Sequence, residues 1–261
     1  MITHYTDLQL NTVSLQGVKQ FYNGLLGIPI VFETETEIRL QVTSFTTLTF
    51  MEAYEPIAPA HFAFEVPYSA FSAVAAFLKE EAGIPILGWP DGREIVEFDT
   101  GVNAYFRDGD GHLLEVIAHR YVREDILPQC GPLKTMYLRE VGFPVENVPE
   151  FREWWFRKFG MRLEKVYDDF TFAIGGTAHA VIASKRRRWI PIGMYALPPR
   201  MTVSFGISGR EALARIRELM DGEIILSAGE DELTITRCDY RIRFVATDFP
   251  ADIAARLNLP G

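Results

Sequence analysis

The sequence predicts an α+β protein built from four tandem modules, each consisting of a strand, a helix and three further strands. Three observations support this fold class. Runs of alternating apolar and polar residues are typical of strands, and stretches with apolar residues three or four positions apart are typical of helices. A glycine follows each predicted helix, where a left-handed residue commonly ends it. The same order of elements recurs at intervals of roughly 55–70 residues, which indicates an internal repeat.

The first two modules show the pattern most clearly. Residues 7–12 alternate and predict the opening strand, and Ser14 is a typical N-cap for a helix that runs to Leu26. The second module opens with a strand at His61, followed by a helix over residues 68–82. The remaining strands of these two modules are expected near 28–34, 37–43, 46–54, 84–87, 94–98, 102–107 and 112–118.

The third module is expected to start near Met136, with a helix over residues 148–159, and the fourth near Met201, with a helix over residues 210–220. Residues 120–134 contain two prolines, one glycine and mixed charges, so they are expected to form a connector. These features divide the chain into residues 1–119, the connector, and residues 135–261.

Composition and charge exclude several protein classes. The 261 residues are 48% hydrophobic, which suffices for well-filled cores, but no apolar run approaches the ~20 residues that span a bilayer. Cys130 and Cys238 lie far apart, so reduced thiols and a cytoplasmic location are expected. The basic run at residues 185–188 is too short to indicate nucleic-acid binding. We therefore expect a small-molecule partner, and neither nucleic acid nor membrane.

Negative charge is concentrated in the first half of the chain. Residues 1–120 carry 16 Asp and Glu against 6 Lys and Arg, a balance of -10, and the remainder carries +1, which together give the whole-chain value of -9. A partly buried acidic cluster in the first half would suit a cation. A solvated acidic surface is the alternative.

Three motifs resemble those of the vicinal oxygen chelate superfamily, which includes glyoxalases, bleomycin-resistance proteins and extradiol dioxygenases. FYNGLLG at residues 21–27 is similar to the FYxxxLG phrase of the first helix, and HFAFEVP at 61–67 resembles the opening strand of the second module. YFRDGDGHLLEV at 105–116 is similar to the signature YFxDPDGxxxEL. Over residues 136–248 the resemblance depends mainly on the repeat pattern. It implies two half-open barrels and one divalent metal ion, with Fe(II) favoured over Mn, Zn or Ni.

The resemblance also implies the metal ligands. Glu115 occupies the glutamate position of the signature, and His61 occupies the ligand position of the second module. The first-strand ligand lies fourteen residues before Phe21, which is Asp7, where dioxygenases carry His and glyoxalases His or Gln. His4 is the alternative, because positions 4 and 7 cannot both face inward on a regular strand.

Further candidates are less specific. Tyr105 lies ten residues before Glu115, at an offset where the ring-cleaving enzymes carry a tyrosine that contacts the substrate; an ordinary strand residue is the alternative. The position of their acid–base histidine is Val96, so another group must transfer protons, and His112 and His119 are nearby. Glu52 is a weaker candidate ligand.

The second half is expected to lack a metal site. Glu140 lies fourteen residues before Trp154, as Asp7 does before Phe21, but residues 240–245 place no carboxylate where Glu115 would align. We expect residues 136–248 to support the fold, close a pocket or form a homo-oligomer, and we expect Glu140→Ala to leave metal content unchanged.

The sequence thus favours a metal-dependent enzyme of the ring-cleaving extradiol dioxygenase type. A glyoxalase-like isomerase or lyase is the first alternative. A metal-free protein that binds a small molecule in an aromatic groove is the second, and a purely structural protein is a third.

Overall fold

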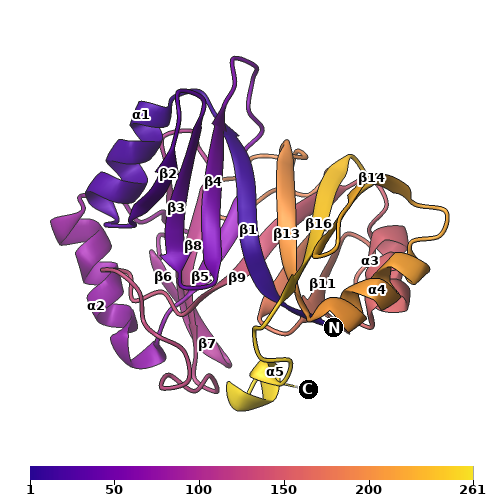
Figure 1. The fold of residues 1–261 in the computed structure, drawn as a ribbon. Helices are drawn as coiled ribbons and strands as arrows, with labels where there is room; N and C mark the ends of the chain where they lie inside the picture. The colour runs from indigo at the N-terminus through magenta and orange to yellow at the C-terminus, as the bar shows by residue number, and fades with distance from the viewer. Residues whose placement is uncertain (261) are drawn as a thin grey trace.

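The computed structural model describes residues 1–260 and confirms the α+β class. The strands form two mixed sheets of eight strands each, and the helices flank them (Figure 1). Helices α1 and α2 lie together at one side of the molecule, and α3 and α4 lie together at the other (Figure 1). Among the described helices, none is both long and apolar enough to cross a membrane.

The two sheets have related strand orders. The first runs β14 (Ile224–Ala228), β15 (Glu232–Arg237), β16 (Tyr240–Thr247), β13 (Met201–Ser208), β1 (Ile2–Thr12), β4 (Thr46–Glu52), β3 (Glu37–Thr43), β2 (Ile30–Glu33). The second runs β10 (Arg162–Glu164), β11 (Phe170–Gly175), β12 (Ala178–Ser184), β9 (Tyr137–Val145), β5 (His61–Glu65), β8 (Leu113–His119), β7 (Gly101–Arg107), β6 (Ile95–Phe98).

Each sheet combines one module from each half of the chain. The opening strands of the first and fourth modules, β1 and β13, pair antiparallel, and so do those of the second and third, β5 and β9. The predicted halves, residues 1–119 and 135–261, therefore do not correspond to the two sheets. The connector of residues 120–134 links two modules that share one sheet.

The helices begin and end where local chemistry predicts. The Ser14 hydroxyl accepts a hydrogen bond from the Gly17 amide at 3.1 Å and caps α1 (Leu15–Val18). This helix continues as the π-helical segment η1 (Lys19–Leu25). Gly160 follows α3 (Val148–Phe159) with φ of 63°, the left-handed conformation that glycine adopts without strain. The other helical segments are η2 (Tyr68–Ala70), α2 (Phe71–Ala76), η3 (Phe77–Glu81), α4 (Arg210–Leu219) and α5 (Ile253–Arg256).

The strand expected near residues 84–87 is absent, so that prediction was wrong. Pro85 cannot donate a backbone hydrogen bond, and Gly88 and Pro90 follow within five residues. The alternating pattern of this segment still reflects burial: the segment is irregular, but the side chains of Ile84 and Ile86 both lie in the core. Burial of alternate side chains does not require a paired strand.

Strand β8 shows how each sheet separates the core from the inner face. Leu114, Val116 and Ala118 belong to the main apolar core. Glu115 and His119, which alternate with them, line a cavity on the opposite face of the sheet. Because successive strand residues point to opposite faces, the apolar packing of one set directs the polar set inward.

Candidate metal centre

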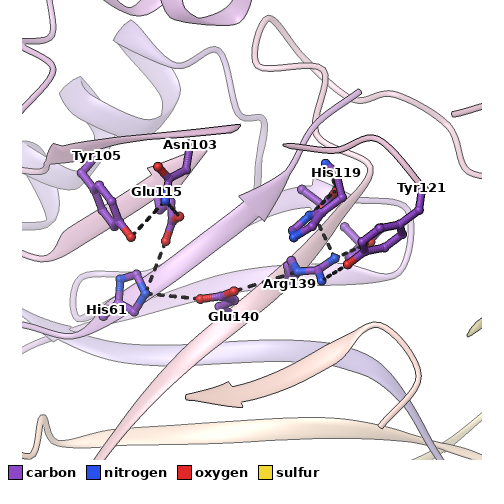
Figure 2. A network of polar contacts seen from close by, with 10 residues as sticks. His61, Asn103, Tyr105, Glu115, His119, Tyr121, Arg139 and Glu140 are labelled. Atoms are coloured by element: carbon purple, nitrogen blue, oxygen red, sulfur yellow. Dashed lines mark hydrogen bonds and ion pairs between the residues drawn. The ribbon is translucent and has the colours of Figure 1, made fainter. Parts of the chain in front are cut away.

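Three buried side chains from three neighbouring strands converge on the inner face of the second sheet (Figure 2). His61 begins β5, Glu115 lies in β8, and Glu140 lies in β9. The His61 Nε2 atom is 3.6 Å from Glu115 Oε2 and 3.7 Å from Glu140 Oε2. One candidate ligand atom from each residue lies within 4.8 Å of the others, and no residue of the three is more than 7% exposed.

Strand register explains the convergence. Ala63 of β5 pairs with Glu115 on one side and with Glu140 on the other. His61 precedes Ala63 by two residues, so its ring leaves the same face of the sheet. The three ligand candidates therefore depend on both the β5–β8 and the β5–β9 pairings.

Neighbouring groups orient two of the three side chains. The Nδ1 atom of His61 is 3.1 Å from the Leu113 carbonyl, which can only accept, so Nδ1 carries a proton and Nε2 faces the carboxylates. The Asn103 amide donates to Glu115 Oε1 at 2.8 Å and lies 3.2 Å from the Tyr105 hydroxyl. Such outer hydrogen bonds hold metal ligands in a fixed orientation.

The electrostatics of the cluster favour a cation. Burial, and next the charge of Glu140, raise the pKa of Glu115 to about 8. Burial acts against ionisation of Glu140 as well, but His61 and Arg139 outweigh it, and the pKa of that carboxyl is lowered. For His61 the two carboxylates outweigh burial and raise its pKa. Two buried carboxylates face a single imidazole, so a divalent ion bound between them would balance their negative charge.

The donor set fits a divalent metal ion. One imidazole and two carboxylates suit Fe(II), Mn(II), Zn(II) and Ni(II). A site with three protein ligands leaves coordination positions for water or substrate, as catalytic sites require. His61, Glu115 and Glu140 would hold the ion.

Asp7 does not join this cluster, contrary to the prediction that placed it with His61 and Glu115. It lies in β1 of the other sheet, where Thr47 and Thr49 donate hydrogen bonds to its carboxylate at 2.6 and 2.8 Å. Burial raises the pKa of the Asp7 carboxyl.

The alternatives to Asp7 lie in the first sheet too. His4 of β1 is packed with its ring 4.1 Å from that of Phe249, and Glu52 ends β4. Glu140 takes the third place in the cluster because β5 pairs with β9 rather than with β1. The signal for Glu140 was its fourteen-residue offset from Trp154, which matches that of Asp7 from Phe21.

A second group of acidic residues and a histidine lies in the loop between β7 and β8, at Asp108, Asp110 and His112. The Nδ1 atom of His112 accepts a hydrogen bond from the Ala60 amide at 2.9 Å, so the other ring nitrogen carries the proton and has no lone pair for a metal. Asp108 accepts hydrogen bonds from the Tyr22 hydroxyl at 2.7 Å and the His112 amide at 2.8 Å. These contacts stabilise the turn.

A cavity of about 610 Å³ adjoins the candidate metal centre. Glu115 and Glu140 contribute to its wall, and Tyr105, which pairs with Glu115 across β7 and β8, lines it as well. Its other aromatic and polar lining residues include Trp89, Phe98, Tyr121, Phe172, His119, Arg139, Lys165 and His179. Near the centre, the ring of Trp189 packs 5.2 Å from that of His61.

Comparisons with known proteins support the fold. No family model matches the sequence, and no curated protein matches it significantly. A proposed dioxygenase from Bacillus subtilis subsp. subtilis strain 168 aligns over 99% of this chain and 91% of its own, with 13% identity and a TM-score of 0.70. Glyoxalase I from Zea mays aligns over 97% and 95%, with 15% identity and a TM-score of 0.58.

A third similar structure is the cppA protein from Streptococcus pneumoniae TIGR4, which aligns over 94% of this chain and 98% of its own, with 13% identity and a TM-score of 0.54. These similarities extend over almost the whole chain, so they concern both sheets. At such low identities they show a shared fold and leave the chemistry to the residues of the site.

Proposed function

Since the chain has the vicinal oxygen chelate fold, we propose that it is a metal-dependent enzyme acting on a small substrate with two neighbouring oxygen atoms. The observation that carries this proposal is the buried convergence of His61, Glu115 and Glu140 beside a cavity of about 610 Å³. A divalent ion bound there would supply Lewis acidity, and iron would add redox chemistry with dioxygen.

The cavity favours a flat, aromatic substrate. Its volume lies within the ~300–1,000 Å³ typical of small-molecule sites, and rings from Trp89, Phe98, Tyr105 and Phe172 line its walls. We therefore propose ring opening of a catechol-like compound, with Fe(II) as the metal. The Tyr105 hydroxyl, 3.2 Å from the Asn103 amide nitrogen and close to Glu115, would contact a substrate oxygen.

One observation favours a second candidate, a glyoxalase-like isomerase or lyase. Glu115 and Glu140 would neutralise a divalent ion completely, whereas two imidazoles and one carboxylate would leave one positive charge. A less positive ion lowers the pKa of a bound hydroxyl less and so activates a catechol less. Lewis-acid chemistry on a carbonyl or thiol adduct with Ni(II) or Zn(II) is the alternative.

The first experiment measures metal. Protein purified without a chelator or a nickel column should contain close to one divalent ion per chain, and His61→Ala should lose it while retaining its circular dichroism spectrum. A folded wild type that takes up no Fe, Mn, Zn, Ni or Co would refute the proposal.

The second experiment distinguishes the two reactions. Fe(II)-loaded protein, prepared anaerobically, is exposed to oxygen with a panel of substituted catechols, and the yellow ring-opened product is followed. Tyr105→Phe should slow this reaction at unchanged metal content, while Tyr54→Phe, at a tyrosine that is 91% exposed, should match wild type. Isomerisation of a methylglyoxal–thiol adduct with Ni(II) or Zn(II), without any catechol turnover, would favour the alternative. Ligand binding without metal would refute both.

A further inference from the structure

The cavity beside the candidate metal centre has a second region, which is rich in hydrogen-bond donors. We call it the donor region and define it as Tyr121, Arg139, Lys165 and His179, all of which line the cavity. Figure 2 shows Arg139 and Tyr121 beyond Glu140, on the side away from His61. The proposed metal chemistry uses none of the four side chains of the donor region.

Strand pairing places the donor region next to the metal ligands. His179 of β12 pairs with Glu140 of β9, so these two side chains leave the same face of neighbouring strands, which lie ~4.8 Å apart. Strand β9 has a bulge opposite Ala63 and Phe64, with Arg139 as the extra residue, so Arg139 and Glu140 both reach the cavity. Arg139 Nε lies 3.9 Å from Glu140 Oε1.

The Tyr121 hydroxyl has a proton left to donate. Arg139 is paired with the completely buried Glu65, with Nη1 3.0 Å from the carboxylate, and its Nη2 atom donates to the Tyr121 hydroxyl at 2.8 Å. Since the phenol oxygen accepts this bond, its own O–H bond points elsewhere, and no acceptor for it lies among residues 1–260. The guanidinium also polarises the phenol and makes it a stronger donor.

His179 is buried without a hydrogen-bond partner. It is 6% exposed, and its ring makes no hydrogen bond within the described part of the chain. Burial, and next the charge of Arg139, lower the pKa of His179 well below its ordinary value, so the ring is neutral. A neutral imidazole keeps one N–H group, and a buried donor without an acceptor costs free energy. An acceptor bound in the cavity would remove that cost.

Lys165 adds a positive charge to the same side of the cavity. It follows β10, and its ammonium group lies 5.3 Å from the centre of the Phe172 ring, which is 6.4 Å from the centre of the His179 ring. Lys165 forms no ion pair with any residue that the structure describes. Lys165 and His179 therefore both lie beside Phe172, and both offer a donor.

The carboxylates of the cavity do not serve these donors. Glu65 binds Arg139, and Glu164 forms an ion pair with Arg162. Asp99 also lines the cavity, but it is exposed at the turn between β6 and β7. The donor region thus has more donors than acceptors. A ligand carboxylate, which only accepts and has two oxygens, complements it with charge-assisted hydrogen bonds.

We propose that the cavity binds a substrate that carries a carboxylate group in addition to its two neighbouring oxygen atoms. The carboxylate accepts hydrogen bonds from His179, Lys165 and the Tyr121 hydroxyl, and Arg139 holds the Tyr121 oxygen in place. This assignment rests on the proposed function, because the two neighbouring oxygens face the candidate metal centre. It narrows the substrate from a catechol-like compound to a catechol-like acid.

The test is isothermal titration calorimetry of Zn(II)-loaded protein with two probes. One is dihydrocaffeate, a catechol whose side chain ends in a carboxylate, and the other is its primary amide, which has nearly the same size and no charge. Wild type should bind the acid about tenfold more tightly than the amide, because a charged acceptor forms stronger hydrogen bonds than a neutral one.

Substitutions in the donor region should lower this preference at unchanged zinc content. Lys165→Met should lower it about threefold, because an exposed ion pair is partly screened by water. His179→Leu should lower it further, and His179→Gln, which keeps an N–H donor, should retain most of it. Lys134→Met is the matched control, because Lys134 is also an exposed lysine with positive φ, 52° against 49° for Lys165, but lies outside the cavity.

The outcomes separate this proposal from the proposed function. A zinc-loaded wild type that binds acid and amide equally would overturn the carboxylate site and leave the metal centre intact. Equal losses for both probes in Lys165→Met and His179→Leu would show that these residues only shape the cavity, which would also overturn it. A wild type that takes up no zinc but still prefers the acid would refute the proposed function alone. A zinc-loaded wild type that binds neither probe would refute both.

Discussion

Replacing Glu140 with glutamine tests the candidate metal centre most directly. Glu140→Gln keeps the size of the side chain but replaces a carboxylate oxygen, 3.7 Å from His61 Nε2, by a neutral and weaker donor. We expect metal affinity to fall strongly while the fold is maintained. The sequence predicted that a substitution at Glu140 would leave metal content unchanged, so the structure reverses that expectation.

The magnitude follows from the number of ligands. A structural zinc site with four ligands binds with about 10–16 kcal/mol, or roughly 2.5–4 kcal/mol for each ligand. Part of this loss is recovered, because Glu140 is one cause of the raised pKa of Glu115, and removing its charge relieves repulsion between the two carboxylates. A net loss of about 2–3 kcal/mol corresponds to a reduction in affinity of roughly 30- to 150-fold.

The assay is a competition titration with a chromophoric chelator, using Zn(II) and metal-free protein. Glu164→Gln is the matched control, because Glu164 lines the same cavity but lies outside the cluster of His61, Glu115 and Glu140. It should bind zinc as wild type does. If Glu140→Gln also binds zinc within threefold of wild type, Glu140 is not a ligand and the proposed centre is wrong.

Two further predictions concern the first sheet. Asp7→Asn should leave metal content unchanged, and loss of metal would show that Asp7 is a ligand after all. The variant should also be at least as stable as wild type at pH 7 in urea denaturation, because burial raises the pKa of the Asp7 carboxyl and its ionisation in the folded protein costs free energy. Burial lowers the pKa of His4 to about 4, so its contribution to stability is complete above pH 6.5 and is lost as the pH falls toward 4. This loss amounts to about 3 kcal/mol, and His4→Gln should remove that part of the pH dependence; an identical pH dependence in both proteins would contradict it.

The sequence determined the local elements of this protein. Ser14 and Gly160 mark a helix start and a helix end through hydrogen bonding and a left-handed backbone, which involve only neighbouring residues. Glu115 followed from the resemblance of residues 105–116 to the superfamily signature. His61 followed from the motif at the start of its strand.

Only the tertiary structure decided which modules combine, and therefore which third ligand joins His61 and Glu115. Asp7 and Glu140 occupy matching places in two similar modules, and nothing in their local patterns distinguishes them. The choice depends on whether β5 pairs with β9 or with β1, a contact between opening strands more than fifty residues apart. That pairing is set by the packing of both sheets together, because each opening strand offers the same backbone hydrogen-bonding groups to any partner.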